Sequence, residues 1–140
     1  MHFLCRHTVS WGDNMLKLSE VQKALSARTI EGQDKLNREA ESAFGADLMS
    51  DVLAFTRKKT LLLTGLTNVQ VIRTADVSEL SAIVFVRGKI PGAEILQVAK
   101  ECDIPVLLTD YTMFEACGIL YKLGLPACHI KETKKDEQIR

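Results

Sequence analysis

Three short apolar runs with helical patterns between them constrain the fold of this chain most. The runs lie at residues 60–64, 82–86 and 105–108, and none of them alternates strictly between polar and apolar side chains. Strands that are covered by helices on both faces have this composition. Because a helical pattern separates each run from the next, the three runs are predicted to pair in parallel through right-handed crossovers.

The segments around these runs continue the alternation of helices and strands. Further strands are predicted at 28–31 and 41–46. Periodic apolar residues and helix-start signals predict helices at 19–25, 48–55, 68–75, 92–102 and 112–124. The pattern is typical of an α/β layer fold, and we find no linker that would divide it into two domains.

Capping residues predict where the helices begin. A Ser or Thr followed three residues later by Glu or Gln can satisfy two orphan amide groups at a helix start. The predicted pairs are Ser19 with Gln22, Thr67 with Gln70 and Thr112 with Glu115, and Asp47 is predicted to cap the helix after it. In that helix Leu48, Val52 and Phe55, with Met49 and Leu53 beside them, form the face expected to meet a sheet.

The ends of the chain differ from its centre. Residues 1–14 have no helical or strand periodicity and are expected to be an N-terminal extension, whereas 15–125 form the predicted domain. Residues 126–140 form a mostly polar C-terminal tail, whose last ten residues are expected to be disordered because they can bury little apolar surface. Within the last predicted helix, Gly118 is expected to allow close packing against a neighbour.

Charge and cysteine content exclude several functional classes. Lys plus Arg and Asp plus Glu each number 18, so no broad basic field exists for nucleic acid or a membrane surface. No apolar run is long enough to cross a bilayer, and a cytoplasmic protein is expected. The four cysteines contain no CxxC pair, so we expect reduced thiols, no metal site and no cofactor.

The loops that leave the three predicted strands form the candidate binding site. In a parallel sheet these loops converge on one edge, where open α/β folds bind their ligands. Glycine and hydroxyl groups at a helix start suit an anion, two cations add to this preference, and an aspartate and a tyrosine can bond to a sugar or base. The predicted ligand-binding residues are Thr64, Gly65, Thr67, Asn68, Arg87, Gly88, Lys89, Thr109, Asp110 and Tyr111.

Other interpretations of these loops stay open. The first loop can be simply a well-formed helix start, and Arg87 and Lys89 can be solvated turn residues. The loop also lacks the second glycine and the lysine of a Walker motif, so hydrolysis of nucleoside triphosphates is not supported. No nucleophile with a base, paired carboxylates or metal ligands come together, and therefore no catalytic residues and no enzymatic activity are predicted.

Several stretches of the chain resemble the DRTGG domain family. The stretches lie between about Leu16 and Leu125, and they are Lys35–Glu39, Ala46–Ala54, Ala82–Phe85, Ile104–Thr109, Thr112–Ala116 and Leu120-Tyr121. The family signature itself is degenerate, since the run from Asn37 to Glu41 keeps only the arginine, Arg38, and loses both glycines. Loss of those glycines implies a lost or altered ligand site if they allow close backbone approach.

The resemblance implies a fold and a type of role. DRTGG domains resemble the N-terminal domain of HPr kinase/phosphorylase, a three-layer α/β/α fold around a mixed, mostly parallel sheet of about five strands. They occur in certain phosphotransacetylases and beside CBS-pair domains, where they look regulatory or oligomer-forming. Catalysis in those proteins lies in another domain.

Two functional hypotheses follow from the sequence, besides a third, an enzyme that acts on a phosphate ester or acyl phosphate, which rests only on the anion-friendly loops and the family resemblance. The first is a stand-alone regulatory domain that binds a small anionic metabolite or nucleotide, a partner protein such as a separate enzyme or kinase, or both. The second is a homodimerisation or protein-interaction module without a small ligand, in which Gly118 and the apolar residues Met113, Phe114 and Leu120 serve an interface. A homodimer is compatible with both hypotheses.

Overall fold

A five-stranded mixed sheet forms the middle layer of the structure, a computed structural model that describes residues 15–128. Strands β4 to β7 are parallel, and β2 at the far edge is antiparallel to β7. The predicted α/β fold with a mostly parallel sheet is therefore confirmed. In spatial order the strands are β2 (Arg28–Glu31), β7 (Val106–Leu108), β6 (Ala82–Phe85), β5 (Thr60–Thr64) and β4 (Ser42–Gly45).

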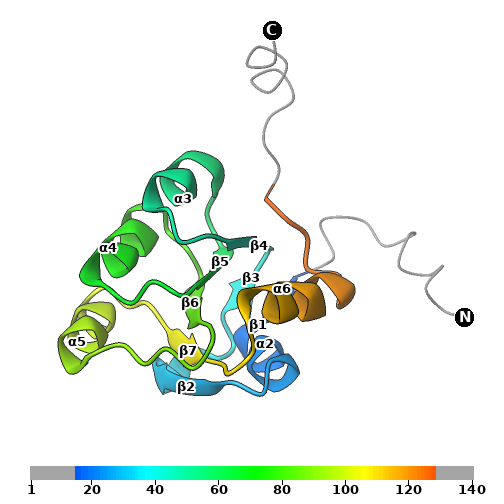
Figure 1. The fold of residues 1–140 in the computed structure, drawn as a ribbon, viewed down its shortest axis with the longest axis horizontal. Coiled ribbons are helices and arrows are strands. Elements are labelled where there is room, and N and C mark those ends of the chain that lie inside the picture. The colour runs from blue at the N-terminus through cyan, green and yellow to red at the C-terminus, as the bar shows by residue number, and fades with distance from the viewer. Residues whose placement is uncertain (1–14, 129–140) are drawn as a thin grey trace, which may run out of the picture.

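Helices cover both faces of this sheet, and the three-layer arrangement expected from the family resemblance is present (Figure 1). One face carries α3 (Met49–Phe55), α4 (Val69–Val77) and α5 (Ala93–Glu101), and the other carries α2 (Leu18–Ala24) and α6 (Met113–Lys122). Beside them lie a two-stranded ladder of β1 (Leu16–Lys17) with β3 (Glu39–Ala40) and the 3-10 turn η2 (Gln33–Lys35).

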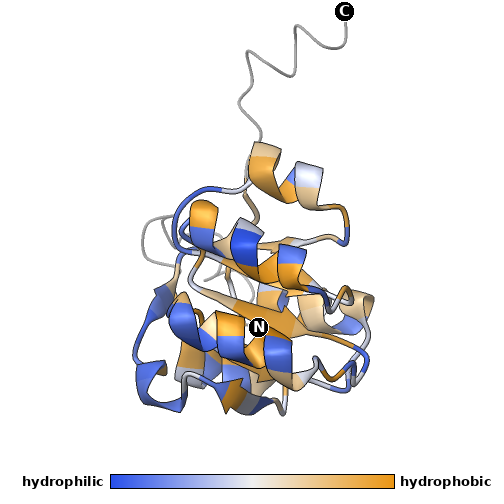
Figure 2. Cartoon of the chain, turned by 90° about the vertical axis from the view of Figure 1, so that its left-hand side faces the viewer, coloured by the Kyte–Doolittle hydropathy of each residue, from blue (hydrophilic) through white to orange (hydrophobic). Residues whose placement is uncertain are grey.

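Side chains of the central strands point alternately into two cores. Leu61 and Leu63 pack in the core under α2 and α6, whereas Leu62 packs in the core under α3, α4 and α5. All three are completely buried. In Figure 2 the apolar colour is concentrated in the strands, while polar and apolar residues are mixed along the helices. Burial on both faces explains why successive residues inside these strands are apolar, with Thr60 and Thr64 only at the two ends of β5.

The start of α6 agrees with its prediction. The backbone amide of Glu115 donates to Oγ1 of Thr112 at 3.2 Å, and the amide of Thr112 donates to Oε1 of Glu115 at 2.9 Å. Both bonds of a capping box are therefore present. The bond from the Thr112 amide, and after it one from the Thr112 hydroxyl at 3.0 Å, holds the pKa of the Glu115 carboxyl below its ordinary value, because both bonds stabilise the ionised form.

The predicted capping pair of the first helix is wrong. The helix begins at Leu18, directly after the short strand β1, so Ser19 already lies within its first turn. Glu20 replaces Gln22 as the residue that reaches back, and its Oε1 accepts from the amide of Lys17 at 2.8 Å. The pairing of Lys17 in β1 decides the position of this helix start, which the residue pattern alone did not reveal.

The predicted capping pair of Thr67 with Gln70 is also wrong. Asn68 has the extended backbone of a cap residue, with φ −121° and ψ 171°. Its side chain accepts from the amide of Val71 at 3.3 Å. The helix start therefore lies one residue further along the chain than the pair predicted.

Two predictions about packing are wrong, because the residues concerned lie exposed at the surface. In α3 the buried residues are Met49 and Val52, but Leu48 and Leu53 are 60% and 51% exposed. This helix lies toward the edge strand β4, where the sheet ends and covers only part of the predicted face. A β-carbon at Gly118 would meet nothing within 4 Å, so the predicted close packing within the chain is wrong as well.

The chain continues as part of the fold beyond α6. The amide of Ala43 in the edge strand β4 donates to the carbonyl of Pro126 at 2.9 Å, and Ala43 forms a parallel bridge with Ala127. Residues 1–14 and 129–140, which include most of the predicted extension and tail, lie outside the described range. Between residues 15 and 128, no helix combines the length and the apolar character that a bilayer crossing needs.

Candidate functional site

The carboxyl ends of β4, β5, β6 and β7 lie along one edge of the sheet, here called the rim. Paired residues establish this alignment, since Gly45 lies beside Leu63, and Phe85 lies beside both Thr64 and Leu108. The rim comprises the loops that follow these ends, at residues 46–48, 64–68, 86–92 and 109–112. The structure therefore brings together the three loops that the sequence placed at a common edge, called here the first (64–68), second (86–92) and third (109–112) rim loops.

The connections that follow the neighbouring strands β6 and β7 lead to opposite faces of the sheet. The loop after β6 leads to α5 on one face of the sheet, whereas the loop after the neighbouring strand β7 leads to α6 on the other face. In open α/β sheets, ligands usually bind at the carboxyl ends of the strands where the connections change sides in this way. Arg87, Lys89, Asp110 and Tyr111 lie in these two diverging loops.

Asp47 holds the first rim loop instead of capping α3. The residue before that helix is Leu48, which makes no side-chain capping bond. Oδ1 of Asp47 accepts from Oγ1 of Thr64 and from the amide of Gly65, both at 2.9 Å. The hydroxyl and amide that were expected to face an anionic ligand are thus already bonded to a carboxylate of the chain itself. Oγ1 of Thr64 also accepts from the amide of Leu66 at 3.1 Å.

Arg87 crosses from the second rim loop to the first. Its guanidinium lies 2.9 Å from the position that a β-carbon would take at Gly65. Arg87 and Gly88 both have positive φ, 58° and 66°, and together they turn the chain sharply after β6. Because Gly65 has no side chain, this guanidinium can lie directly over the backbone between β5 and β6.

The second and third rim loops are tied together through their backbones. The amide of Arg87 donates to the carbonyl of Tyr111 at 2.8 Å, and the amide of Gly88 donates to the carbonyl of Thr109 at 2.9 Å. Oδ1 of Asp110 lies 3.1 Å from the β-carbon position of Gly88. A carboxylate and a guanidinium therefore both lie at the diverging loops, held by a short and well-bonded turn.

Thr109 has a structural role. It is 1% exposed, and its Oγ1 donates to the carbonyl of Leu25 at 2.7 Å. The same oxygen accepts from the amide of Tyr111 at 3.3 Å. These bonds join the end of β7 to the end of α2 and leave the hydroxyl pointing inward.

The ten predicted site residues fall into three groups by accessibility. Buried are Thr64, Gly65 and Thr109; partly exposed are Thr67, Gly88 and Tyr111; exposed are Asn68, Arg87, Lys89 and Asp110. Asn68 is committed to its helix cap. The polar groups that the rim presents to a ligand are therefore chiefly Arg87, Lys89, Asp110 and Tyr111.

Sequence reasoning missed Asp47 as a member of the rim. The residue follows the end of β4, as Thr109 and Asp110 follow the end of β7. Treating 41–46 as a fourth parallel strand would have placed Asp47 at the same edge. Among the described residues, no group of three or more His, Cys, Asp or Glu side chains is arranged to hold a metal ion.

The degenerate signature lies at the opposite end of the sheet from the rim. Nη1 of Arg38 donates to the carbonyls of Ser81 and Asp103 at 3.3 and 3.1 Å, and its Nη2 lies 3.1 Å from Oδ2 of Asp103. Ser81 directly precedes β6, and Asp103 lies just before β7. The retained arginine therefore joins the amino ends of two core strands to the segment before β3. A cavity of about 420 Å³ lies beside it, lined in part by Lys59 and Glu79.

Two cations surround Asp103 at this opposite end. Nζ of Lys35 lies 3.0 Å from its Oδ1, and Arg38 contacts its other oxygen. The hydrogen bond from Lys35 is the largest influence that holds the pKa of Asp103 below its ordinary value, and the Arg38 guanidinium adds to it. The pKa of Lys35 is raised in return by the same carboxylate. This ion-pair cluster is largely exposed and belongs to the scaffold.

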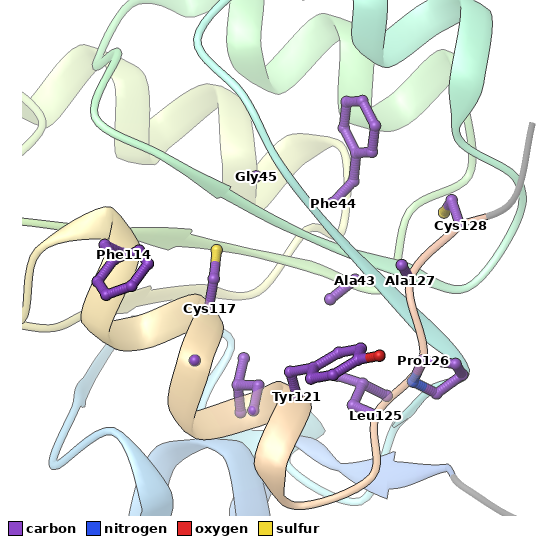
Figure 3. Close-up of a pocket in the computed structure, with 12 residues that line it drawn as sticks. Ala43, Phe44, Gly45, Phe114, Cys117, Tyr121, Leu125, Pro126, Ala127 and Cys128 are labelled. Atoms are coloured by element: carbon purple, nitrogen blue, oxygen red, sulfur yellow. The ribbon is translucent and has the colours of Figure 1, made fainter.

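An apolar groove of about 430 Å³ runs between α6 and the edge strand β4 (Figure 3). Cys117 of α6 points toward Gly45 across the groove, and the ring of Tyr121 extends toward Pro126. Burial raises the pKa of the Cys117 thiol, because the thiolate is poorly solvated there. The groove is separate from the diverging loops of the rim, and its lining offers few polar groups.

Together these features define an open α/β domain with accessible polar residues, chiefly Arg87, Lys89, Asp110 and Tyr111, at the carboxyl ends of its parallel strands. The model of the DRTGG domain family matches residues 20–123, which is most of the chain. The chain belongs to the DRTGG domain family. No curated protein matches it.

A solved structure with a similar fold comes from Clostridium perfringens. It contains the CBS and DRTGG domains of the regulatory region of a pyrophosphatase, complexed with the activator diadenosine tetraphosphate. The two chains are 17% identical and superpose with a TM-score of 0.64 over 88% of this chain. This chain covers 58% of that structure, and the likeness establishes the shared fold.

Proposed function

We propose that this domain is a regulatory module that binds a nucleotide or a similar small anionic metabolite at the rim, between the loops after β6 and β7. The observation that carries the proposal is the position of Arg87, which reaches from the loop after β6 and places its guanidinium over Gly65 at the rim. A guanidinium suits bidentate bonding to a phosphate group. Lys89 supplies a second cation two residues further along the same loop.

The remaining groups suit the other parts of a nucleotide. Asp110 is exposed next to Gly88 and can accept from ribose hydroxyls, as acidic residues do at other α/β dinucleotide sites. Tyr111 is partly exposed and offers a ring for stacking on a base. The regulatory region that shares this fold binds diadenosine tetraphosphate, which favours a nucleotide over other anions.

Asp47 restricts how an anion can bind at the rim. Its carboxylate already accepts from Thr64 and Gly65, so a phosphate would be repelled from the first loop. We therefore place the phosphate near Arg87 and Lys89, on the side of the rim that faces Asp110. Thr64, Gly65 and Thr109 support the site from within and do not contact the ligand.

In this proposal the domain has no chemistry of its own and transmits occupancy of the rim to a partner protein, such as a separate enzyme or kinase. Four cysteines without a paired motif suit a reducing compartment, and we propose the cytoplasm. The two rim loops lead to α5 and α6 on opposite faces of the sheet. A ligand that contacts both loops would thus be sensed on both faces.

Thermal melting with a defined set of compounds tests the proposal. The probes are ATP, ADP, diadenosine tetraphosphate, acetyl phosphate and inorganic phosphate, each in excess. A ligand present at about a hundred times its Kd adds about 2.7 kcal/mol to the unfolding free energy, which raises the Tm by several degrees. We expect at least one nucleotide to raise the Tm of the unaltered chain.

Two double variants locate the site. Arg87→Gln with Lys89→Gln removes both rim cations and should abolish the shift. Arg57→Gln with Lys58→Gln makes the same charge change at the amino end of β5 and should retain it. Absence of a shift with every probe would count against nucleotide binding, and a shift that survives in the rim variant would place the ligand elsewhere.

A further inference from the structure

Helix α6 presents an exposed stripe whose residues have no partner in the described chain. Phe114 is 88% exposed and Tyr121 is 70% exposed, and they lie four residues before and three residues after Gly118. These spacings place the two rings and Gly118 on one face of the helix. Large aromatic side chains at such exposure indicate a surface that another molecule covers.

The apolar groove between α6 and β4 adjoins this stripe. Phe114, Gly118 and Tyr121 line one wall of the groove. Ala43 and Gly45 of β4 lie on the other (Figure 3). A β-carbon at Gly118 would meet nothing within 4 Å, so the helix backbone is open to close approach from outside. The surface thus combines projecting rings with a hollow beside them, as a self-complementary interface requires.

The charges beside the stripe favour a second copy of this chain as the molecule that covers it. Glu115 lies in the first turn of α6 and Lys122 in the last, three residues before and four residues after Gly118. When two copies of α6 cross antiparallel at Gly118, Glu115 of each copy comes beside Lys122 of the other, and Phe114 comes beside Tyr121. The same pairing occurs twice because the axis is two-fold.

We propose that α6 is the contact surface of a homodimer, in which the α6 helices of two copies cross antiparallel at Gly118. The two aromatic residues of each copy cover the partner's groove, and the two Glu115–Lys122 pairs set the direction of the helices. This proposal uses a surface other than the rim. The dimer can therefore be tested on the chain without any nucleotide.

The first test measures mass against concentration. The chain has a mass of 15.6 kDa, and light scattering of the full chain should approach twice this value as the concentration rises from micromolar to millimolar. Gly118→Gln should raise the dissociation constant by about tenfold or more, because it separates the crossing helices. Circular dichroism should show the variant folded, since the position is open in a single copy.

The second test exchanges the two charges. In a dimer of the Lys122→Glu variant, Glu115 of each copy would lie beside a glutamate of the other. In a dimer of the Glu115→Lys variant, Lys122 of each copy would lie beside a lysine of the other. Each variant alone should therefore be mainly monomeric. An equal mixture should restore the dimer, because both pairs are again of opposite charge. Lys100→Glu makes the same change in the last turn of α5, on the other face of the sheet, and should dimerise like the unaltered chain.

Three results would overturn the proposal. One is a single-chain mass at every concentration. Another is a dimer that neither Gly118→Gln nor Lys122→Glu weakens, since such a dimer uses another surface. The third is a mixture of the two charge variants that stays monomeric although both are folded. Restoration of the dimer in that mixture supports the antiparallel contact specifically, because a general loss of stability in either variant would persist on mixing.

Discussion

The guanidinium of Arg87 lies 2.9 Å from the point where a β-carbon would stand on Gly65. The two residues belong to different rim loops, so the absence of a side chain at one position determines where the charge of the other lies. This contact brings the exposed cation of the rim over the backbone between β5 and β6.

Gly65→Ala should separate stability from ligand binding. The new methyl group displaces only the end of a flexible arginine, so the unfolding free energy should fall by less than about 1 kcal/mol. The Tm shift produced by a nucleotide should shrink, because the guanidinium is moved. Gly32→Ala is the contrasting variant: its φ is +82° and its β-carbon would lie 2.8 Å from Cα of Pro105, so it should lose about 2 kcal/mol or more. Equal losses in urea unfolding would contradict this account.

Asp47 should matter for stability more than an exposed aspartate normally does. Asp47→Ala leaves the buried Thr64 hydroxyl and the Gly65 amide without their acceptor, and should cost about 1–3 kcal/mol. Asp47→Asn keeps an acceptor oxygen at the same position and should cost less. Denaturant unfolding of both variants, with Asp51→Ala in α3 as a control, checks the order. An alanine variant as stable as the unaltered chain would show that water replaces the carboxylate.

Gly118→Ala should stabilise the single folded chain. Alanine in a helix interior is favoured over glycine by about 0.5–1 kcal/mol, and nothing within 4 Å opposes the methyl group. The measurement is urea unfolding at a concentration low enough to keep the protein monomeric. A destabilised variant would indicate that the groove closes on this position in solution.

Stability should decrease in acid partly through Asp103. Its pKa is lower in the folded chain than in the unfolded chain because Lys35 and Arg38 favour the ionised form. A lowered pKa stabilises the fold above the unfolded value, about 3.9, and this contribution is lost as the pH falls through the folded value. Asp103→Asn should therefore reduce stability near neutral pH and flatten its decline below about pH 4.

Salt provides the check on that prediction. The side chain of Asp103 is 62% exposed, so high ionic strength should weaken its effect on stability. Asp34→Asn is the matched control, because Asp34 is 82% exposed and lies 3.5 Å from the same lysine. If Asp34→Asn and Asp103→Asn show the same pH profile, the Lys35–Arg38 cluster is not the cause.

The amino-acid sequence by itself determined the alternation of strands and helices, the parallel central strands and the convergence of their loops. Runs such as Thr60–Thr64 carry this information locally, because a strand buried on both faces needs apolar residues at successive positions. The capping box of Thr112 with Glu115 was equally readable, since both partners lie within one helical turn.

Only the tertiary structure decided which groups at the rim remain available. Asp47 could form an ordinary helix cap or bond to Thr64, and the choice depends on β4 lying beside β5, a contact between segments far apart in the chain. The sequence around Gly118 likewise does not reveal whether this glycine faces a strand or open space, and the structure shows open space. Helical and strand periodicity specify which side of an element is apolar, but the partner that covers it is set by long-range packing.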